Sequence, residues 1–226
     1  MMMIILVRHG EATHHTEHLT GGWTDSVLTE QGHRQLQLLA LRLAKDFSGH
    51  HKQVPTIITS DLRRAEESAE IIANALGGKV SSMEFLREKN NGLAAGLTEE
   101  AARALYDAPA TLKELDHANY PGGETRRQFF YRVQSGLRVL GDLTKEDLII
   151  VAHKGTIQNI IFDWSGFDIE AINAHNFSVD ILPASITILG INKWQEHAIF
   201  LLNDTAHLHA QGGVGVFGFK YAGKHH

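Results

Sequence analysis

Cationic and imidazole side chains follow three short apolar runs that lie far apart in the sequence. They are Arg8 and His9, Arg63 and Arg64, and His153 and Lys154. The planar fork of arginine suits a carboxylate or a phosphate group. A histidine with an ordinary pKa near ~6.5 is largely unprotonated at neutral pH and can act as a nucleophile. Since the chain carries a net charge of −5, this local concentration of cations predicts that the ligand is an anion.

Arginines from two different segments could together hold several oxygens of one tetrahedral group. Phosphoryl transfer needs mainly positioning and neutralisation of three equatorial oxygens, which such a cluster can supply without a metal. Neighbouring arginines also favour the neutral form of a histidine, because like charges repel. The residue types therefore favour phosphoryl transfer that involves a histidine.

The elements that must position these residues can be predicted from the apolar pattern. The runs 4–7, 56–59 and 148–152 are short, continuous and rich in β-branched residues, which is typical of strands buried on both faces. Weaker strands are expected at 80–83, 186–189 and 197–202. Helical spacing predicts helices that begin after the N-cap residues Thr29 and Ser60, a patchy helix over 98–115 that Pro109 interrupts, and helices over 124–143 and 155–164.

This alternation predicts an α/β fold with three layers, in which helices cover both faces of a mostly parallel central sheet. Ligands of such sheets bind beyond the carboxyl ends of the strands, so the three cationic positions are expected to meet at one edge. No mid-chain linker or repeat is evident, and residues 1–226 are expected to form a single domain. Segment 90–123 is expected to cap the site, and 210–226 to form a loosely ordered tail.

The composition narrows the classes of protein further. The chain has no cysteine, which excludes disulfides, a thiolate nucleophile and zinc sites that need sulfur. Its acidic balance argues against binding to nucleic acid. No apolar run approaches the ~20 residues that a membrane helix needs, and the N-terminal run has no basic segment before it. A cytoplasmic protein without membrane contact is expected.

Fifteen histidines raise the question of a metal site. Their spacing matches no standard zinc signature, so neither a metal nor another cofactor is expected. Histidines such as His14, His18 and His207 are expected to be polar surface residues.

Four segments in the same order resemble the motifs of the histidine phosphatase superfamily, which includes the cofactor-dependent phosphoglycerate mutases. The first is Leu-Val-Arg-His-Gly-Glu at 6–11, and the others are the segments 60–65, 86–92 and 151–153. The resemblance implies a phosphoglycerate mutase-like fold. It implies that His9 is the nucleophile that becomes phosphohistidine, and that Arg8, Arg64 and His153 surround the phosphoryl group. Glu88 would protonate the leaving oxygen and later accept a proton from water.

The sequence departs from the family pattern at positions that would touch the substrate. His15 stands where asparagine is usual, and Lys154 follows the second histidine where glycine is usual. His15, Lys154 and Gly22, which lies in the loop 14–23, are therefore expected to join Arg8, Arg64 and His153 in binding the substrate. The expected partner is a small-molecule phosphate ester, bound by a monomer or a homodimer.

Three functions are compatible with these motifs. The expected one is a metal-independent phosphatase for phosphate monoesters. A phosphoglycerate mutase-type transfer is the first alternative, but segment 89–120 is shorter than the mutase insertion and caps the site less well against water. A module that binds a phosphorylated ligand without turnover is the second alternative.

Overall fold

The computed structural model describes residues 2–50, 52–111 and 114–209. The tail expected at 210–226 lies outside the described residues. Within them, the centre of the molecule is a six-stranded sheet in the order β3-β2-β4-β1-β5-β6. Its strands are β1 (Met3–Arg8), β2 (Thr56–Thr59), β3 (Val80–Ser82), β4 (Leu148–Ala152), β5 (Ile186–Ile191) and β6 (His197–Asp204).

The first four strands of the chain pair in parallel, whereas β5 pairs antiparallel with both β1 and β6. The strands β1, β2 and β4 therefore end at the same edge of the sheet. Because each apolar run forms a strand next to another one, the predicted convergence of the cationic positions follows from the topology. The predicted α/β fold with a mostly parallel sheet is confirmed.

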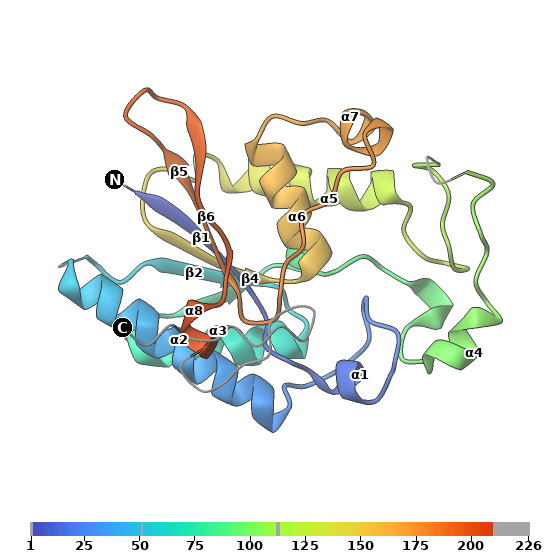
Figure 1. The fold of residues 1–226 in the computed structure, drawn as a ribbon, viewed down its shortest axis with the longest axis horizontal. Coiled ribbons are helices and arrows are strands. Elements are labelled where there is room, and N and C mark those ends of the chain that lie inside the picture. Colours follow the sequence, from blue (N-terminus) through green and yellow to red (C-terminus); the bar gives the residue numbers. More distant parts are fainter. Residues whose placement is uncertain (1, 51, 112–113, 210–226) are drawn as a thin grey trace, which may run out of the picture.

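Helices cover both faces of the sheet (Figure 1). The helices α2 (Glu30–Gly49) and α3 (Arg63–Leu76) lie on one face, and α5 (Arg126–Leu140) and α6 (Lys154–Trp164) on the other. Shorter elements connect them: α1 (Thr13–Thr16), the 3₁₀ turns η1 (Glu84–Leu86) and η2 (Gly92–Ala94), α4 (Glu99–Arg103), α7 (Ile169–Ala174) and α8 (Ala206–His209).

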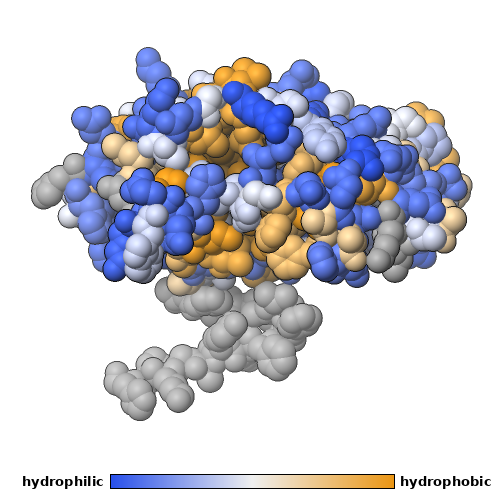
Figure 2. Space-filling model, turned by 90° about the horizontal axis from the view of Figure 1, so that it is seen from above, coloured by the Kyte–Doolittle hydropathy of each residue, from blue (hydrophilic) through white to orange (hydrophobic). Residues whose placement is uncertain are grey.

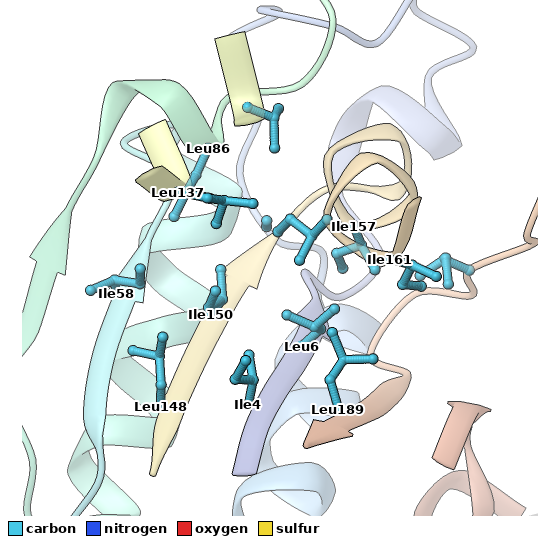
Figure 3. Close-up of a cluster of buried hydrophobic side chains, with 14 of the residues drawn as sticks. Ile4, Leu6, Ile58, Leu86, Leu137, Leu148, Ile150, Ile157, Ile161 and Leu189 are labelled. Carbon is cyan, nitrogen blue, oxygen red and sulfur yellow. The ribbon is translucent and has the colours of Figure 1, made fainter. Parts of the chain in front are cut away.

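Side chains of each central strand alternate between two apolar clusters, because successive residues of a strand face opposite sides. Ile4 and Leu6 pack toward α5 and α6, while Ile5 and Val7 pack toward α2 and α3. Figure 3 shows part of the first cluster, in which Ile150 of β4 lies among side chains of neighbouring strands. The strands are thus held rigidly from both sides, which fixes the positions of the residues that follow them.

The ends of three predicted elements differ from the structure. Leu62, not Ser60, is the N-cap of α3, because the Ser60 hydroxyl binds another partner described below. The helix predicted over 124–143 begins only after Thr125, whose hydroxyl accepts a bond from the Gln128 amide. Of the helix predicted over 98–115, the five residues of α4 are the helical part among the residues described there, 98–111 and 114–115.

Figure 2 shows mainly hydrophilic residues on the face seen from above Figure 1, with hydrophobic residues in smaller areas between them. In the part of the chain that the structure describes, no helix combines the length and the apolar character needed to cross a membrane.

The core position of Ile150 gives a test of this packing. Ile150 is fully buried, whereas Val139 on α5 is 87% exposed. Replacing Ile150 by Ala should lower the free energy of unfolding by about 2–5 kcal/mol, since it leaves a cavity. The control V139A should change it by less than about 0.5 kcal/mol. Urea unfolding measures both, and equal effects would contradict the packing described here.

Candidate active site

The residues predicted to meet at the sheet edge surround a cavity of about 370 Å³. Arg8 and His9 lie at the end of β1, and Arg64 lies in the first turn of α3. The lining of the cavity includes seven of the eight predicted site residues: Arg8, His9, His15, Gly22, Arg64, Glu88 and Lys154. The eighth, His153, is buried beside His9, with ring centroids 5.1 Å apart. The structure thus brings the whole predicted set together.

The ring of His9 is buried and held in one orientation. Its Nδ1 donates a hydrogen bond of 2.7 Å to the carbonyl oxygen of Gly10, so the neutral ring leaves Nε2 unprotonated. Burial lowers the pKa of His9 well below its usual value, and the nearby charges of Arg64, His153 and Arg8 lower it further. His9 is therefore a neutral imidazole with a free lone pair at physiological pH.

Arg64 is 1% exposed, and among the described residues its guanidinium is hydrogen-bonded to neutral oxygens and not to a carboxylate. Its Nη1 donates to the carbonyl oxygen of Thr24 at 2.8 Å and to the Ser26 hydroxyl at 3.2 Å, and Nη2 donates to the carbonyl of Gly22 at 2.7 Å. Burial is the main reason why its pKa falls to about 10. The guanidinium keeps its charge and is aimed by neutral oxygens of one loop.

Arg8 and His15 lie together on another side of the cavity. Nη1 of Arg8 donates to the carbonyl of Ile181 at 2.5 Å, and its Nη2 lies 3.2 Å from Nε2 of His15. Nδ1 of His15 accepts from the amide of Ala12 at 3.1 Å. Burial above all lowers the pKa of His15 to about 4, so the neutral ring carries its proton on Nε2. Two N–H donors then lie next to each other, and an anion beside the pair would accept from both.

His153 follows β4, and its ring is fixed by Ser60. The Ser60 hydroxyl accepts from the amide of Leu62 at 3.3 Å and lies 2.9 Å from Nε2 of His153. The described residues give the Ser60 hydroxyl no other acceptor for its proton, so it donates to Nε2 and the proton of the neutral ring is on Nδ1. Burial lowers the pKa of His153 well below its usual value, with Arg64 and Arg8 contributing next.

Three of these residues carry a buried nitrogen donor for which the described residues supply no acceptor. They are Nε of Arg8, Nε of Arg64 and Nδ1 of His153. A buried donor without an acceptor is costly and rare in a folded protein. The site therefore has donors in excess of acceptors, which is the expected state of an anion-binding pocket.

The carboxylates of Glu88 and Glu99 line the cavity, and backbone amides hold that of Glu88. Its Oε1 accepts from the amide of Lys89 at 2.8 Å, and Oε2 accepts from the amide of Gly155 at 2.9 Å. A Cβ atom at position 155 would lie 2.5 Å from Oε1. Glycine at the start of α6 therefore lets the carboxylate reach this position.

Two residues that the sequence did not single out hold the backbone of Glu88. The indole nitrogen of Trp23 donates to the carbonyl of Glu88 at 2.7 Å, and Nη2 of Arg132 donates to it at 3.0 Å. Arg132 also binds both carboxylate oxygens of Glu124, at 2.7 and 2.8 Å. The two contacts to the carbonyl of Glu88 join segments that are 44 or more residues apart, so no local pattern could have revealed them.

The expectation that His14 is a surface residue was wrong. His14 is 7% exposed, and its Nδ1 lies 2.9 Å from the Ser26 hydroxyl that also accepts from Arg64. Burial chiefly lowers its pKa to about 3. His14 is thus part of the support of Arg64, at a position where a polar surface residue was expected.

Lys154 is largely exposed and forms an ion pair with Asp180 at the rim of the cavity. Across the described ranges, no group of three or more His, Asp or Glu side chains is arranged to hold a metal ion.

Comparisons with known proteins agree with this geometry. The model of the histidine phosphatase superfamily (branch 1) matches residues 4–205. Phosphoglycerate mutase-like protein 4 of Arabidopsis thaliana is 29% identical over 215 residues, which are 92% of this chain and 88% of the relative. The uncharacterized phosphatase PhoE of Bacillus subtilis is 32% identical over 171 residues, 75% of this chain and 81% of the relative. The solved alpha-ribazole phosphatase from Shigella flexneri shares the fold, with a TM-score of 0.75 and 22% identity over 91% of this chain and 98% of that one.

The burial of His14 predicts how stability depends on pH. In the unfolded chain a histidine takes up a proton below about pH 6.5, whereas folded His14 stays neutral down to about pH 3. The unfolded state therefore binds more protons between these values, and the free energy of unfolding falls as the pH falls through this window. The variant H14Q should show a shallower decline between about pH 6.5 and 4.

Urea unfolding at a series of pH values in this window measures the decline. The control H33Q changes a histidine that is exposed on α2 and should leave the slope of the wild type unchanged. An equal slope in H14Q and the wild type would show that His14 is not buried as a neutral ring.

Proposed function

We propose, from the premise that this chain belongs to the histidine phosphatase superfamily (branch 1), that it hydrolyses phosphate monoesters through a phosphohistidine on His9. The proposal rests chiefly on the three buried donors without acceptors, on Arg8, Arg64 and His153. A transferring phosphoryl group has three equatorial oxygens that need such donors. These donors lie around a neutral imidazole whose lone pair is free.

In the first step, Nε2 of His9 attacks the phosphorus atom, and the bond from phosphorus to the ester oxygen breaks. Arg8 and Arg64 share the charge of the phosphoryl oxygens, and the neutral ring of His153 donates from Nδ1. This stabilisation grows as charge develops in the transition state, and it needs no reorganisation because the donors are already in place.

Glu88 handles the protons of both steps. As a carboxylic acid it donates its proton to the departing oxygen, so that an alcohol leaves instead of an alkoxide. The resulting carboxylate then accepts a proton from water, whose oxygen attacks phosphorus and displaces His9. Inorganic phosphate and the original protonation state of Glu88 and His9 are the result.

A phosphoglycerate mutase-type transfer is the second candidate, and one observation favours it. The Arabidopsis relative is named phosphoglycerate mutase-like. Hydrolysis is the better proposal because the part of segment 90–123 that the structure describes contains only short helical elements, η2 and α4. Such a segment shields the phosphohistidine from water less than a longer insertion would.

Further parts of the proposal concern the setting of the reaction. We propose that it needs no metal, that the substrate is a small molecule, and that the protein works in the cytoplasm as a single domain, alone or as a homodimer. The donors of the cavity support the first point, since protein groups alone supply the positive charge.

Replacing His9 tests the nucleophile. H9A should lose all turnover of 4-nitrophenyl phosphate, while H33A, which removes an exposed histidine of α2, should retain it. Brief mixing of the wild type with a ³²P-labelled ester should leave acid-labile, base-stable label on the protein, and none on H9A. Turnover by H9A would refute the proposal.

Two additions to this assay separate the alternatives. Release of inorganic phosphate indicates hydrolysis, whereas return of the label to a second hydroxyl compound indicates a mutase. Tight binding without label or turnover would indicate a binding module. EDTA should leave the rate unchanged, and strong inhibition by EDTA would show that a metal takes part.

Gly155 gives a separate test of the position of Glu88. In G155A the new methyl group would collide with Oε1 of Glu88 and move the carboxyl group away from the leaving oxygen. We expect kcat to fall by roughly 10- to 100-fold, with a smaller effect on a substrate whose leaving group needs no proton, such as 2,4-dinitrophenyl phosphate. The control is G49A, where a Cβ meets nothing within 4 Å. Equal losses on both substrates would contradict the role of Glu88.

A further inference from the structure

A second cavity, of about 500 Å³, is lined by Glu88 but not by His9. It shares Glu88 and Lys154 with the first cavity, so the carboxyl group lies where the two meet. An ester whose phosphorus lies at His9 and whose leaving oxygen lies at Glu88 can extend its leaving group into this second cavity. The volume lies within the usual range for a small-molecule site.

Two cations of the second cavity have no ion pair among the described residues. Lys89 has one polar contact for its ammonium group, 3.5 Å from the amide oxygen of Asn119. Nη1 of Arg126 donates to the amide oxygen of Asn173 at 2.8 Å. Neither contact neutralises a charge. Burial is the main reason why the pKa values of both groups are lowered. Two partly buried, uncompensated cations favour an anion between them.

The other charged groups of the cavity do not cancel this pair. Lys154 is paired with Asp180, and Glu88 is occupied by two backbone amides. Glu114 also lines the cavity, but it is exposed to solvent, which screens its charge. Glu124 lies near Lys89, yet its carboxylate is bound by Nε and Nη2 of Arg132.

A further, independent observation is an unpartnered donor in the same wall. Asn159 lines the cavity and is 8% exposed, and its buried Nδ2 has no acceptor in the described part of the chain. Phe129 and Tyr106 supply flat apolar surface beside these polar groups. Cations, an unused amide donor and aromatic surface together fit an organic leaving group that carries an acidic substituent.

We propose that Lys89 and Arg126 form a subsite for a second anionic group, a carboxylate or a second phosphate, on the leaving group of the ester. This proposal rests on the proposed phosphatase function, because it assigns the first phosphate to His9. It names the class of substrate: small esters with an anion beyond the bond that is broken. Lys89 and Arg126 are here specificity residues that contact the leaving group.

Three matched esters test the subsite. They are 3-carbamoylphenyl phosphate, its charged isostere 3-carboxyphenyl phosphate, and benzene-1,3-diyl bisphosphate. We expect the wild type to prefer at least one charged ester over the carbamoyl ester by about tenfold or more in kcat/KM. Preference for 3-carboxyphenyl phosphate would indicate a carboxylate subsite, and preference for the bisphosphate would indicate a phosphate subsite.

The variants K89Q and R126Q should each reduce this preference by about tenfold, whatever change they cause in the rates of all three esters. The controls are R138Q and K79Q, which remove exposed cations outside the cavity and should keep the preference of the wild type. A wild type without preference, or a preference that survives in K89Q and R126Q, would overturn the subsite.

Binding to H9A separates this result from a failure of the proposed function. Calorimetry should give tighter binding of the charged ester than of the carbamoyl ester, and R126Q in the H9A background should remove the difference. If the wild type hydrolyses no ester but H9A shows this difference, the reaction is wrong and the subsite stands. If H9A binds the charged and uncharged esters equally, the subsite is refuted even where the reaction is confirmed.

Discussion

The burial of positive charge without a neutralising carboxylate is the constraint on which the rest of this structure depends. Arg64 is 1% exposed, and its contacts are with three neutral oxygens. Taking a guanidinium out of water costs several kcal/mol unless it finds compensation. The loop that contains Gly22 and Thr24 provides part of this compensation, and the unsatisfied Nε remains. An anion in the cavity would complete it, so the folded protein is prepared for such a ligand before it arrives.

The same buried positive charge explains why a histidine and arginines can occupy one site with different protonation states. Burial and the charges of Arg64 and Arg8 both act against a proton on His9. The arginines keep their charge because their ordinary pKa is far above neutrality. The groups that attract a phosphate therefore also keep the imidazole nucleophilic. His14 belongs to this arrangement, since its neutral ring accepts from the hydroxyl of Ser26 and leaves that oxygen free to accept from Arg64.

The sequence allowed the sheet and most of the cavity to be predicted because both depend on local patterns. Continuous β-branched runs become buried strands, and parallel strands bring their carboxyl ends together, so Arg8, His9 and His153 could be placed without coordinates. What could not be predicted depends on contacts between distant segments. Ser60 was expected to cap α3, yet its hydroxyl orients His153. Trp23 and Arg132 carry no local signal for their contact with the backbone of Glu88.

The contacts that hold the backbone of Glu88 separate the part of the site around His9 from the part that would contact the leaving group. His9, Arg8 and Arg64 are fixed by β1, α3 and the loop of Gly22. Glu88 and Lys89 belong to a segment that Trp23 and Arg132 hold in place. Residues of the second cavity come from that segment and from α5 and α6. Substitutions of residues that line the second cavity would alter the contacts available to a leaving group, but His9 and Arg64 do not line this cavity. Glu88 lines both cavities, so in the proposed reaction the leaving group can vary only as far as its oxygen still reaches that carboxyl group.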